Sequence, residues 1–211
     1  MKKTLIIVGV IGGLLLGGVV IIGLLLAGGY NQLVAQSQNV DKSWAQVQNV
    51  YQRRADLIPN LVQTVQGAAN FEKSTLVEIT DARASVGKIQ INNAPTEAAK
   101  LAEFEQAQGR LSSALSRLLV VVEKYPDLKA NANFRDLQAQ LEGTENRISV
   151  ERGTFNNAVQ AYNTAIRSFP AVFYAGMFGF KERPYFAAKA GAEEAPKVQF
   201  DFNKAPAPPS K

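Results

Sequence analysis

The chain has 211 residues, 46% of them apolar, which suffices for one or two domains with a hydrophobic core. Lys and Arg outnumber Asp and Glu by 23 to 18, and this mild excess, without a dense basic run, argues against nucleic-acid binding. Cys and His are both absent, which excludes disulfides, thiol nucleophiles, His-based triads and Cys/His metal or haem sites.

The N-terminal region contains an uncharged apolar stretch over residues 5–29, composed of Leu, Ile, Val, Gly and one Ala. As a helix it would be about 37 Å long, and a bilayer hydrocarbon core is roughly 30 Å thick. A cleaved signal peptide is the alternative, because Lys2 and Lys3 precede the stretch and small residues end it. A signal peptide's apolar region has only roughly 7–15 residues, however. We therefore predict a retained membrane anchor over residues 1–29.

The distribution of basic residues predicts the orientation of this anchor. Lys2 and Lys3 precede the apolar stretch, and Lys42 is the only basic residue within the first twenty positions after it. Cytoplasmic flanks of membrane helices are enriched in Lys and Arg. We therefore expect a single-pass protein of the cell membrane, with its N-terminus in the cytoplasm and the bulk of the chain outside.

Three glycines inside the stretch, Gly9, Gly13 and Gly17, recur every four residues. Small residues at this spacing allow the backbones of two membrane helices to approach closely. They predict association of anchors into a homo-oligomer. The alternative is that these glycines only reflect the general abundance of Gly in membrane helices.

Apolar residues at helical spacing dominate the chain after residue 30, and they predict an all-α fold. Trp44 lies on the first such seam and is expected in the core. The two longest seams have polar interruptions at Gln108, Thr144 and Glu151. These seams consist of Phe104, Gln108, Leu111, Leu115, Leu118, Val122 and Tyr125, and of Phe134, Leu137, Leu141, Thr144, Ile148, Glu151, Phe155, Ala158, Tyr162 and Ile166.

Breaks between the seams predict long helices over residues 30–55, 57–87, 96–125 and 133–168, which would form an antiparallel four-helix bundle. Asp56 would cap the second helix, and Pro59 would lie in its first turn, where a missing N–H is tolerated. A continuous helix kinked at Pro59 is the competing interpretation. Asn133, with Asp136 three residues on, resembles a capping box.

Because the helices of the predicted bundle alternate in direction, the fourth helix is expected to end near the membrane. The uncharged segment that follows, residues 169–180, contains Phe169, Phe173, Phe178 and Phe180. We expect it to cover the base of the bundle or to touch the bilayer interface. The helical domain is expected over residues 30–186. The composition of residues 187–211 predicts a mostly disordered tail, with a possible short strand at 198–202.

Several sequence strings resemble the LemA family, from the anchor to about residue 202. The most specific is Arg53-Arg-Ala-Asp-Leu-Ile-Pro-Asn-Leu-Val62. The others are Tyr30-Asn-Gln-Leu-Val34, Trp44, Leu141-Glu-Gly-Thr-Glu-Asn-Arg-Ile148, Tyr162-Asn-Thr-Ala-Ile-Arg-Ser-Phe-Pro170, Gly179-Phe180 and Tyr185-Phe186. The resemblance implies one N-terminal membrane helix, a helical-bundle domain and no established catalytic activity. Family members often carry a His where this chain has Phe71, so no role based on that His is expected here.

Four polar residues, Arg53, Arg54, Asp56 and Asn60, would lie at the tip of the bundle farthest from the membrane. They could form an interaction surface, but capping by Asp56 and local pairing of the arginines explain the spacing without a partner.

The carboxylates of Glu142, Glu145 and Glu151 invite a metal-site interpretation, which the absence of His weakens. Ion pairs across helix faces explain them better. We therefore predict no catalytic residue, no metal and no cofactor.

These observations predict a non-enzymatic, self-associating scaffold for membrane-associated assemblies, whose partners are membrane lipid and further copies of the chain. The alternative is an adaptor for an envelope enzyme such as a membrane protease, with an unidentified membrane protein as its partner. A metal-dependent hydrolase is a third interpretation, which the missing His and Cys disfavour.

Overall fold

The computed structural model describes residues 2–67, 71–89 and 91–187, with side chains from residue 11 onward. The elements in this part of the chain are helices, without a strand. They are α1 (Lys2–Gln66), α2 (Lys73–Lys88), α3 (Ala98–Val122), α4 (Pro126–Ala130), α5 (Ala132–Arg167) and the 3-10 helix η1 (Ala171–Phe173). The predicted tail at 187–211 and its strand at 198–202 lie almost entirely outside the described residues.

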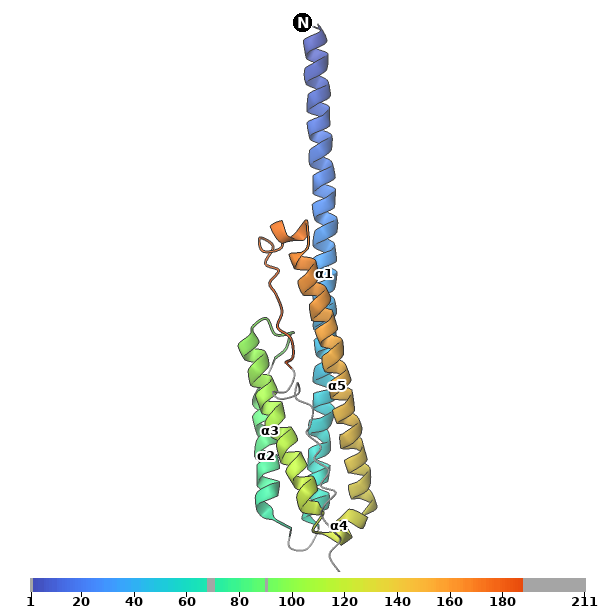
Figure 1. Ribbon diagram of the computed structural model, residues 1–211, viewed down its shortest axis with the longest axis vertical. Coiled ribbons are helices and arrows are strands. Elements are labelled where there is room, and N and C mark those ends of the chain that lie inside the picture. The colour runs from blue at the N-terminus through green and yellow to red at the C-terminus, as the bar shows by residue number, and fades with distance from the viewer. Residues whose placement is uncertain (1, 68–70, 90, 188–211) are drawn as a thin grey trace, which may run out of the picture.

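Helices α1, α2, α3 and α5 alternate in direction and form an antiparallel bundle, as predicted (Figure 1). Their lengths are unequal, however. Helices α1 and α5 lie side by side along the full bundle, whereas the shorter α2–α3 hairpin covers only the part far from the N-terminus. Beside the other part of α5, residues 174–187 run back toward the hairpin as an irregular segment.

Helix α1 runs without interruption from the apolar stretch into the bundle, so the predicted helix boundary at residues 55–57 is wrong. Pro59 lies inside α1 and cannot supply the N–H that would bond to the Ala55 carbonyl. Arg83 of α2 replaces it, because its Nε donates to the Ala55 oxygen at 3.1 Å. Asp56 is therefore not a cap; its carboxylate accepts a hydrogen bond from the Gln52 amide at 2.7 Å.

The start of α5 also differs from its prediction. Asn131, not Asn133, is the N-cap, and its side-chain oxygen accepts hydrogen bonds from the N–H groups of Asn133 and Phe134. The short helix α4 occupies most of residues 126–132, which the predicted helix bounds had left between two helices.

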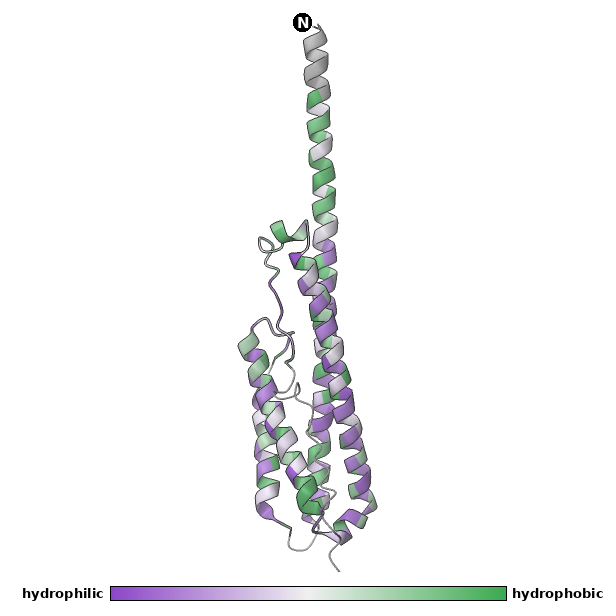
Figure 2. Cartoon of the chain, in the orientation of Figure 1, coloured by the Kyte–Doolittle hydropathy of each residue, from purple (hydrophilic) through white to green (hydrophobic). Residues whose placement is uncertain are grey.

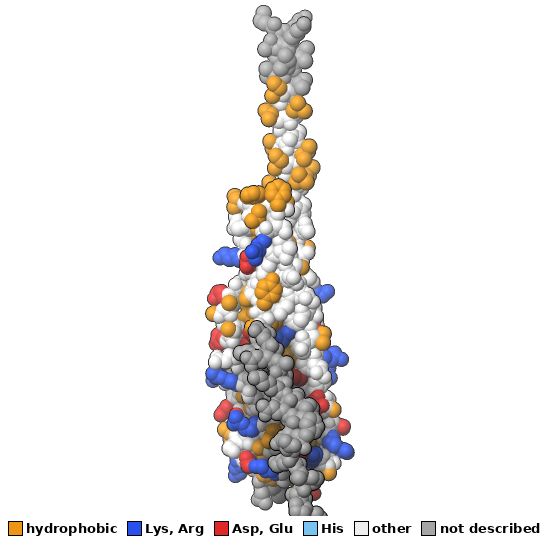
Figure 3. Space-filling view, viewed as in Figure 1, with side chains coloured by type: hydrophobic (Ala, Val, Ile, Leu, Met, Phe, Trp, Pro, Cys, Tyr) orange, Lys and Arg blue, Asp and Glu red, His pale blue; other side chains and the backbone are white. Residues whose placement is uncertain are grey.

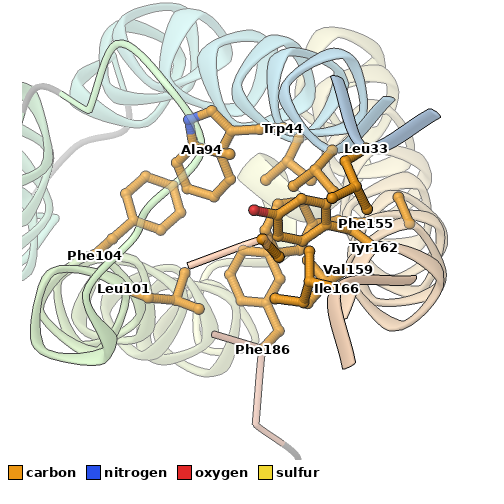
Figure 4. Close-up of a cluster of buried hydrophobic side chains, with 14 of the residues drawn as sticks. Leu33, Trp44, Ala94, Leu101, Phe104, Phe155, Val159, Tyr162, Ile166 and Phe186 are labelled. Atoms are coloured by element: carbon orange, nitrogen blue, oxygen red, sulfur yellow. The ribbon is translucent and has the colours of Figure 1, made fainter. Parts of the chain in front are cut away.

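The buried apolar side chains form two clusters along the bundle. The cluster nearer the anchor surrounds Trp44, which is 1% exposed and contacts Phe104, Phe155 and Phe186 (Figure 4). This confirms the prediction that Trp44 belongs to the core. The distal cluster is formed by α1, α2, α3, α4 and the start of α5, and it includes Leu118.

The N-terminal part of α1 projects beyond the bundle as a single apolar rod (Figure 2). It is long and apolar enough to cross a membrane, and the described part of the chain contains one such helix. Its side chains at residues 11–28 are not buried against the rest of the chain. This helix fits the predicted membrane anchor.

Candidate functional site

The aromatic turn, residues 169–180, lies at the end of the bundle from which the apolar rod projects (Figure 1). Its exposed apolar side chains include Phe169, Phe173 and Phe178, which are 81%, 73% and 54% exposed. Phe180 is half-buried. Apolar side chains of the turn and the rod gather on one visible face of the molecule (Figure 3). The structure therefore places these four predicted residues together at this end.

The aromatic turn packs against α1 at the residues that directly follow the apolar stretch or end it. Tyr174 packs against Gly29, where an added side chain would overlap the tyrosine hydroxyl, so this close approach requires glycine. The next residue, Tyr30, forms edge-on ring contacts with Phe178 and Phe180 at centroid distances of 5.2 and 5.6 Å. These contacts hold the turn at the level where the bundle meets the rod.

Two asparagines of α5 hold the segment that follows the turn. Asn163 accepts from the Arg183 N–H and donates to the Arg183 carbonyl, both at 2.9 Å. Seven residues earlier, Asn156 makes the same pair of hydrogen bonds with the backbone of Phe186, at 2.9 and 3.1 Å. The ring of Phe186 is buried in the cluster around Trp44. These bonds satisfy the backbone of an extended segment that has no neighbouring strand.

A polar layer, formed by Arg54, Gln108, Ser112 and Glu145, separates the two apolar clusters. Arg54 is 2% exposed, and its guanidinium donates to the Ser112 hydroxyl at 2.8 Å and to the Glu145 carboxylate at 3.0 Å. It also bonds to the Gln108 side chain. Its Nε has no hydrogen-bond partner. Because burying a guanidinium is costly without partners, these bonds couple α1 to α3 and α5 at one register.

The predicted interaction surface at the bundle tip is not present as expected. Arg53, Arg54, Asp56 and Asn60 lie in the interior of α1, before its end at Gln66. Arg54 is buried, whereas the other three are exposed. Arg54 points into the bundle, so the four side chains do not share one surface.

A pocket of about 740 Å³ opens beside the polar layer, and Glu105 and Arg152 lie on its wall. The two side chains form an ion pair with 2.6 Å between Nη2 and Oε1. Burial raises the pKa of Glu105, and Arg152 opposes this effect. Burial likewise raises the pKa of Tyr51 at the same pocket.

Among the acidic residues considered for a metal site, Glu145 forms an ion pair, whereas Glu142 and Glu151 form none within the described part of the chain. Glu145 pairs with Arg54, and on α2 Glu78 pairs with Arg117 of α3 at 2.8 Å. Within the described residues, no group of three or more Asp and Glu side chains is placed to hold a metal ion. Glu142 instead accepts a hydrogen bond from Gln138 of the same helix.

Gly13 and Gly17 of the anchor face open space. A side chain added at Gly13 or Gly17 would meet no atom within 4 Å. The side-chain surroundings of Gly9 lie outside the described part of the chain. The structure therefore leaves this face of the rod unpacked in the monomer, and association through it stays a prediction.

Several residues of these sites were not singled out from the sequence. Gln108 was visible as a polar interruption of an apolar seam, and this signal does indicate the polar layer. Asn156 and Asn163 lie seven residues apart, a spacing that places them on one helix face, but nothing local indicates an extended partner. No sequence pattern indicated Lys181 and Arg183, except that these two basic residues occupy alternate positions.

The chain is similar to one family model and to several known proteins. A model of the LemA family matches residues 43–200. Magnetosome protein MamQ 2 of Paramagnetospirillum magneticum is 28% identical over 181 residues, which cover 78% of this chain and 66% of the relative. Magnetosome protein MamQ of Magnetospirillum gryphiswaldense is 27% identical with the same coverage.

A more distant relative is Protein LemA of Metamycoplasma hominis, 23% identical over 140 residues, or 66% of this chain and 60% of the relative. The chain thus spans somewhat less than two thirds of the length of these relatives. None of their names describes an enzymatic activity.

Proposed function

Because the chain belongs to the LemA family, we propose that it is a non-enzymatic scaffold, held in a membrane by its N-terminal helix and assembled from several copies. The observation that carries this proposal is the single unbroken helix α1, which joins the apolar rod to the bundle without a linker. A continuous helix transmits the position of the anchor to the bundle. Contacts between anchors would therefore align neighbouring bundles.

The surface of the rod supports self-association. None of residues 11–28 is buried in the described chain, so lipid and neighbouring anchors are available to contact their side chains. Gly13 and Gly17 lie about 40° apart around the helix and leave a shallow face. Close packing of two such faces is a common way for membrane helices to associate.

The proposed orientation places Lys2 and Lys3 in the cytoplasm and the bundle outside. It is supported by the shortage of basic residues directly after the apolar stretch, where Lys42 is the first. A reporter that is active only in the cytoplasm, fused after Lys211, is expected to be inactive. Activity of that reporter would reverse the orientation.

The scaffold is tested by Gly13→Leu combined with Gly17→Leu in the full-length protein. We expect a shift toward monomer in mild detergent and weaker crosslinking in membranes, with unchanged helical circular dichroism. Gly18→Leu is the matched control, because Gly18 lies about 140° from Gly13 around the helix. A wild-type protein that is monomeric and gives no crosslinks would contradict the scaffold, and recovery of one stoichiometric foreign partner would favour the adaptor.

A further inference from the structure

A groove runs along the bundle between α3 and α5, which form its walls without packing closely against each other. It consists of two adjoining pockets. The first is the pocket of about 740 Å³ beside the polar layer, and the second, of about 290 Å³, continues from it toward the distal end of the bundle. Both are bounded by Arg54, Ser112, Ser116 and Glu145, so they form one continuous surface.

The second pocket, here called the leucine pocket, is apolar inside and acidic at its rim. Its apolar lining consists of Leu61 of α1, Leu115, Leu118 and Leu119 of α3, and Leu141 of α5. Glu142 and Glu145 of α5 are exposed at the same pocket. Such a surface is complementary to an extended segment that carries apolar side chains with a basic residue beside them.

The chain enters this groove at the end of its described part. Ala187 lines the first pocket, and its carbonyl accepts a hydrogen bond from the Arg152 guanidinium at 3.1 Å. The same guanidinium lies over the ring of Phe186, with 4.5 Å between its carbon and the ring centroid. These contacts hold the chain at the mouth of the groove.

The preceding hydrogen bonds set the direction of the chain. Asn163 of α5 bonds to the backbone of Arg183, and Asn156 bonds in the same way to Phe186. Seven residues of helix span about 10.5 Å and three extended residues about 10 Å, so the segment follows the axis of α5. Because later residues of the segment meet earlier residues of α5, the segment runs toward the leucine pocket.

The sequence after Ala187 supplies side chains that match this pocket. Val198, Phe200 and Phe202 alternate with polar residues, so an extended backbone places all three on one face. No other large apolar residue follows Ala187. Lys197 directly precedes the three and supplies a charge opposite to that of the rim.

The connecting segment is long enough to reach the pocket. The eleven residues from Ala187 to Val198 span up to about 36 Å. The α5 residues that line the leucine pocket, 138–145, lie about 10–21 Å along the helix from Arg152. The segment therefore reaches with slack. The LemA family model matches the chain as far as residue 200, so the sequence pattern of the family includes most of this segment.

We propose that residues 188–202 of the same chain occupy the groove. The backbone continues past Ala187 along α5, and Val198, Phe200 and Phe202 cover the leucine pocket. Removal of their apolar surface from water stabilises this arrangement. The proposal goes beyond the scaffold, because it closes the face between α3 and α5 with the protein's own chain and makes that face unavailable to a foreign partner.

The test is crosslinking within the full-length protein, which has no Cys of its own. Ser116→Cys lies in the groove, and Gln199→Cys lies between two of the apolar residues, on the opposite face of the extended segment. With a short bismaleimide reagent, we expect this pair to crosslink within one chain roughly ten-fold faster than Arg110→Cys with Gln199→Cys. Arg110 is an exposed residue of α3 that lines neither pocket.

Arg110 is a matched control because it lies near the level of Glu105, whose partner Arg152 bonds to Ala187. A chain that moved freely after Ala187 would reach position 110 at least as readily as position 116. Equal crosslinking rates at the two positions would therefore overturn the proposal.

Charged substitutions test the apolar contact in the Ser116→Cys and Gln199→Cys protein. Phe200→Asp with Phe202→Asp should lower the crosslinking rate to that of the Arg110 control. Ala205→Asp with Ala207→Asp adds the same charge beyond the apolar residues and should leave the rate unchanged. An unchanged rate in the phenylalanine variant, or an equal loss in the alanine variant, would contradict docking through these side chains.

The identity of the crosslinked chains separates the possible occupants. Crosslinks from position 116 only to another copy, or only to a foreign protein, would assign the groove to that occupant and overturn the proposal. Failure of the scaffold is a separate outcome. A monomeric protein that still forms the intrachain crosslink would retain the closed groove and lose the self-association.

Discussion

At the scale of single residues, buried polar groups determine how the helices pair. Arg54 is almost fully buried, yet Glu145, its ionic partner, is 53% exposed. Replacing Glu145 removes one partner of a buried guanidinium, which is costly, whereas an apolar layer would tolerate several registers. The hydrogen bonds of Arg54 to α3 and α5 thus favour one alignment of the bundle over its alternatives.

A pH dependence follows from Glu105. Burial raises its pKa, so the folded state holds the proton more tightly than the unfolded state. Its contribution to stability is therefore full below the ordinary value of 4.5 and is lost as pH rises through the raised pKa. In unfolding measurements, the free energy of unfolding of Glu105→Gln should therefore rise relative to that of wild type as the pH is raised from about 4 to about 7.

The control for this pH effect is Glu142→Gln, at an exposed carboxylate of α5. We expect the difference in unfolding free energy to change with pH more for Glu105→Gln than for Glu142→Gln. Identical pH profiles for the two variants would show that burial of Glu105 has no measurable consequence.

At the scale of elements, the continuity of α1 depends on a neighbouring helix. The Ala55 carbonyl, which Pro59 cannot satisfy, accepts its hydrogen bond from Arg83 of α2. Arg83→Met should lower the free energy of unfolding by about 1 kcal/mol. In a Pro59→Ala background the restored N–H can bond to Ala55, so the same substitution should cost less. Unfolding of the four proteins of this double-mutant cycle measures the coupling.

Arg117→Met provides the control for this cycle, because Arg117 forms an exposed ion pair with Glu78 and does not contact Ala55. Its cost should be the same with Pro or Ala at position 59. If Arg83→Met also costs the same in both backgrounds, the hydrogen bond to Ala55 does not stabilise α1.

At the scale of the whole molecule, we expect the aromatic turn to make a second contact with the bilayer. Phe173 and Phe178 are exposed beside the apolar rod. Phe173→Asp with Phe178→Asp should weaken this contact because charged groups are unfavourable in the hydrocarbon region. The chain has no Cys, so a label at Val172→Cys can report the contact through quenching by brominated lipids. We expect weaker quenching and a somewhat lower melting temperature, because Phe178 also packs against Tyr30.

The matched control for the aromatic turn is Val120→Asp with Val150→Asp, at exposed positions of α3 and α5. This pair should leave the quenching unchanged. Unchanged quenching in the Phe173 and Phe178 variant would instead place the aromatic turn away from the lipid.

The sequence by itself determined the all-α class, the apolar rod, the family and the core position of Trp44. Each of these follows from patterns within one segment, such as hydropathy, helical spacing or a specific string. The seam interruption at Gln108 also indicated a polar position that the structure places in the polar layer.

Only the tertiary structure decided where α1 ends and which polar residues meet. Local rules end a helix near Pro59, but Arg83, distant in sequence, satisfies the carbonyl that Pro59 leaves free. Likewise Arg54 was expected at an exposed tip, and its burial became visible only with α3 and α5 in place. The physical reason is the same in both cases. The local sequence shows the cost of an unsatisfied carbonyl or of a buried guanidinium, but the hydrogen bond that compensates this cost comes from another helix.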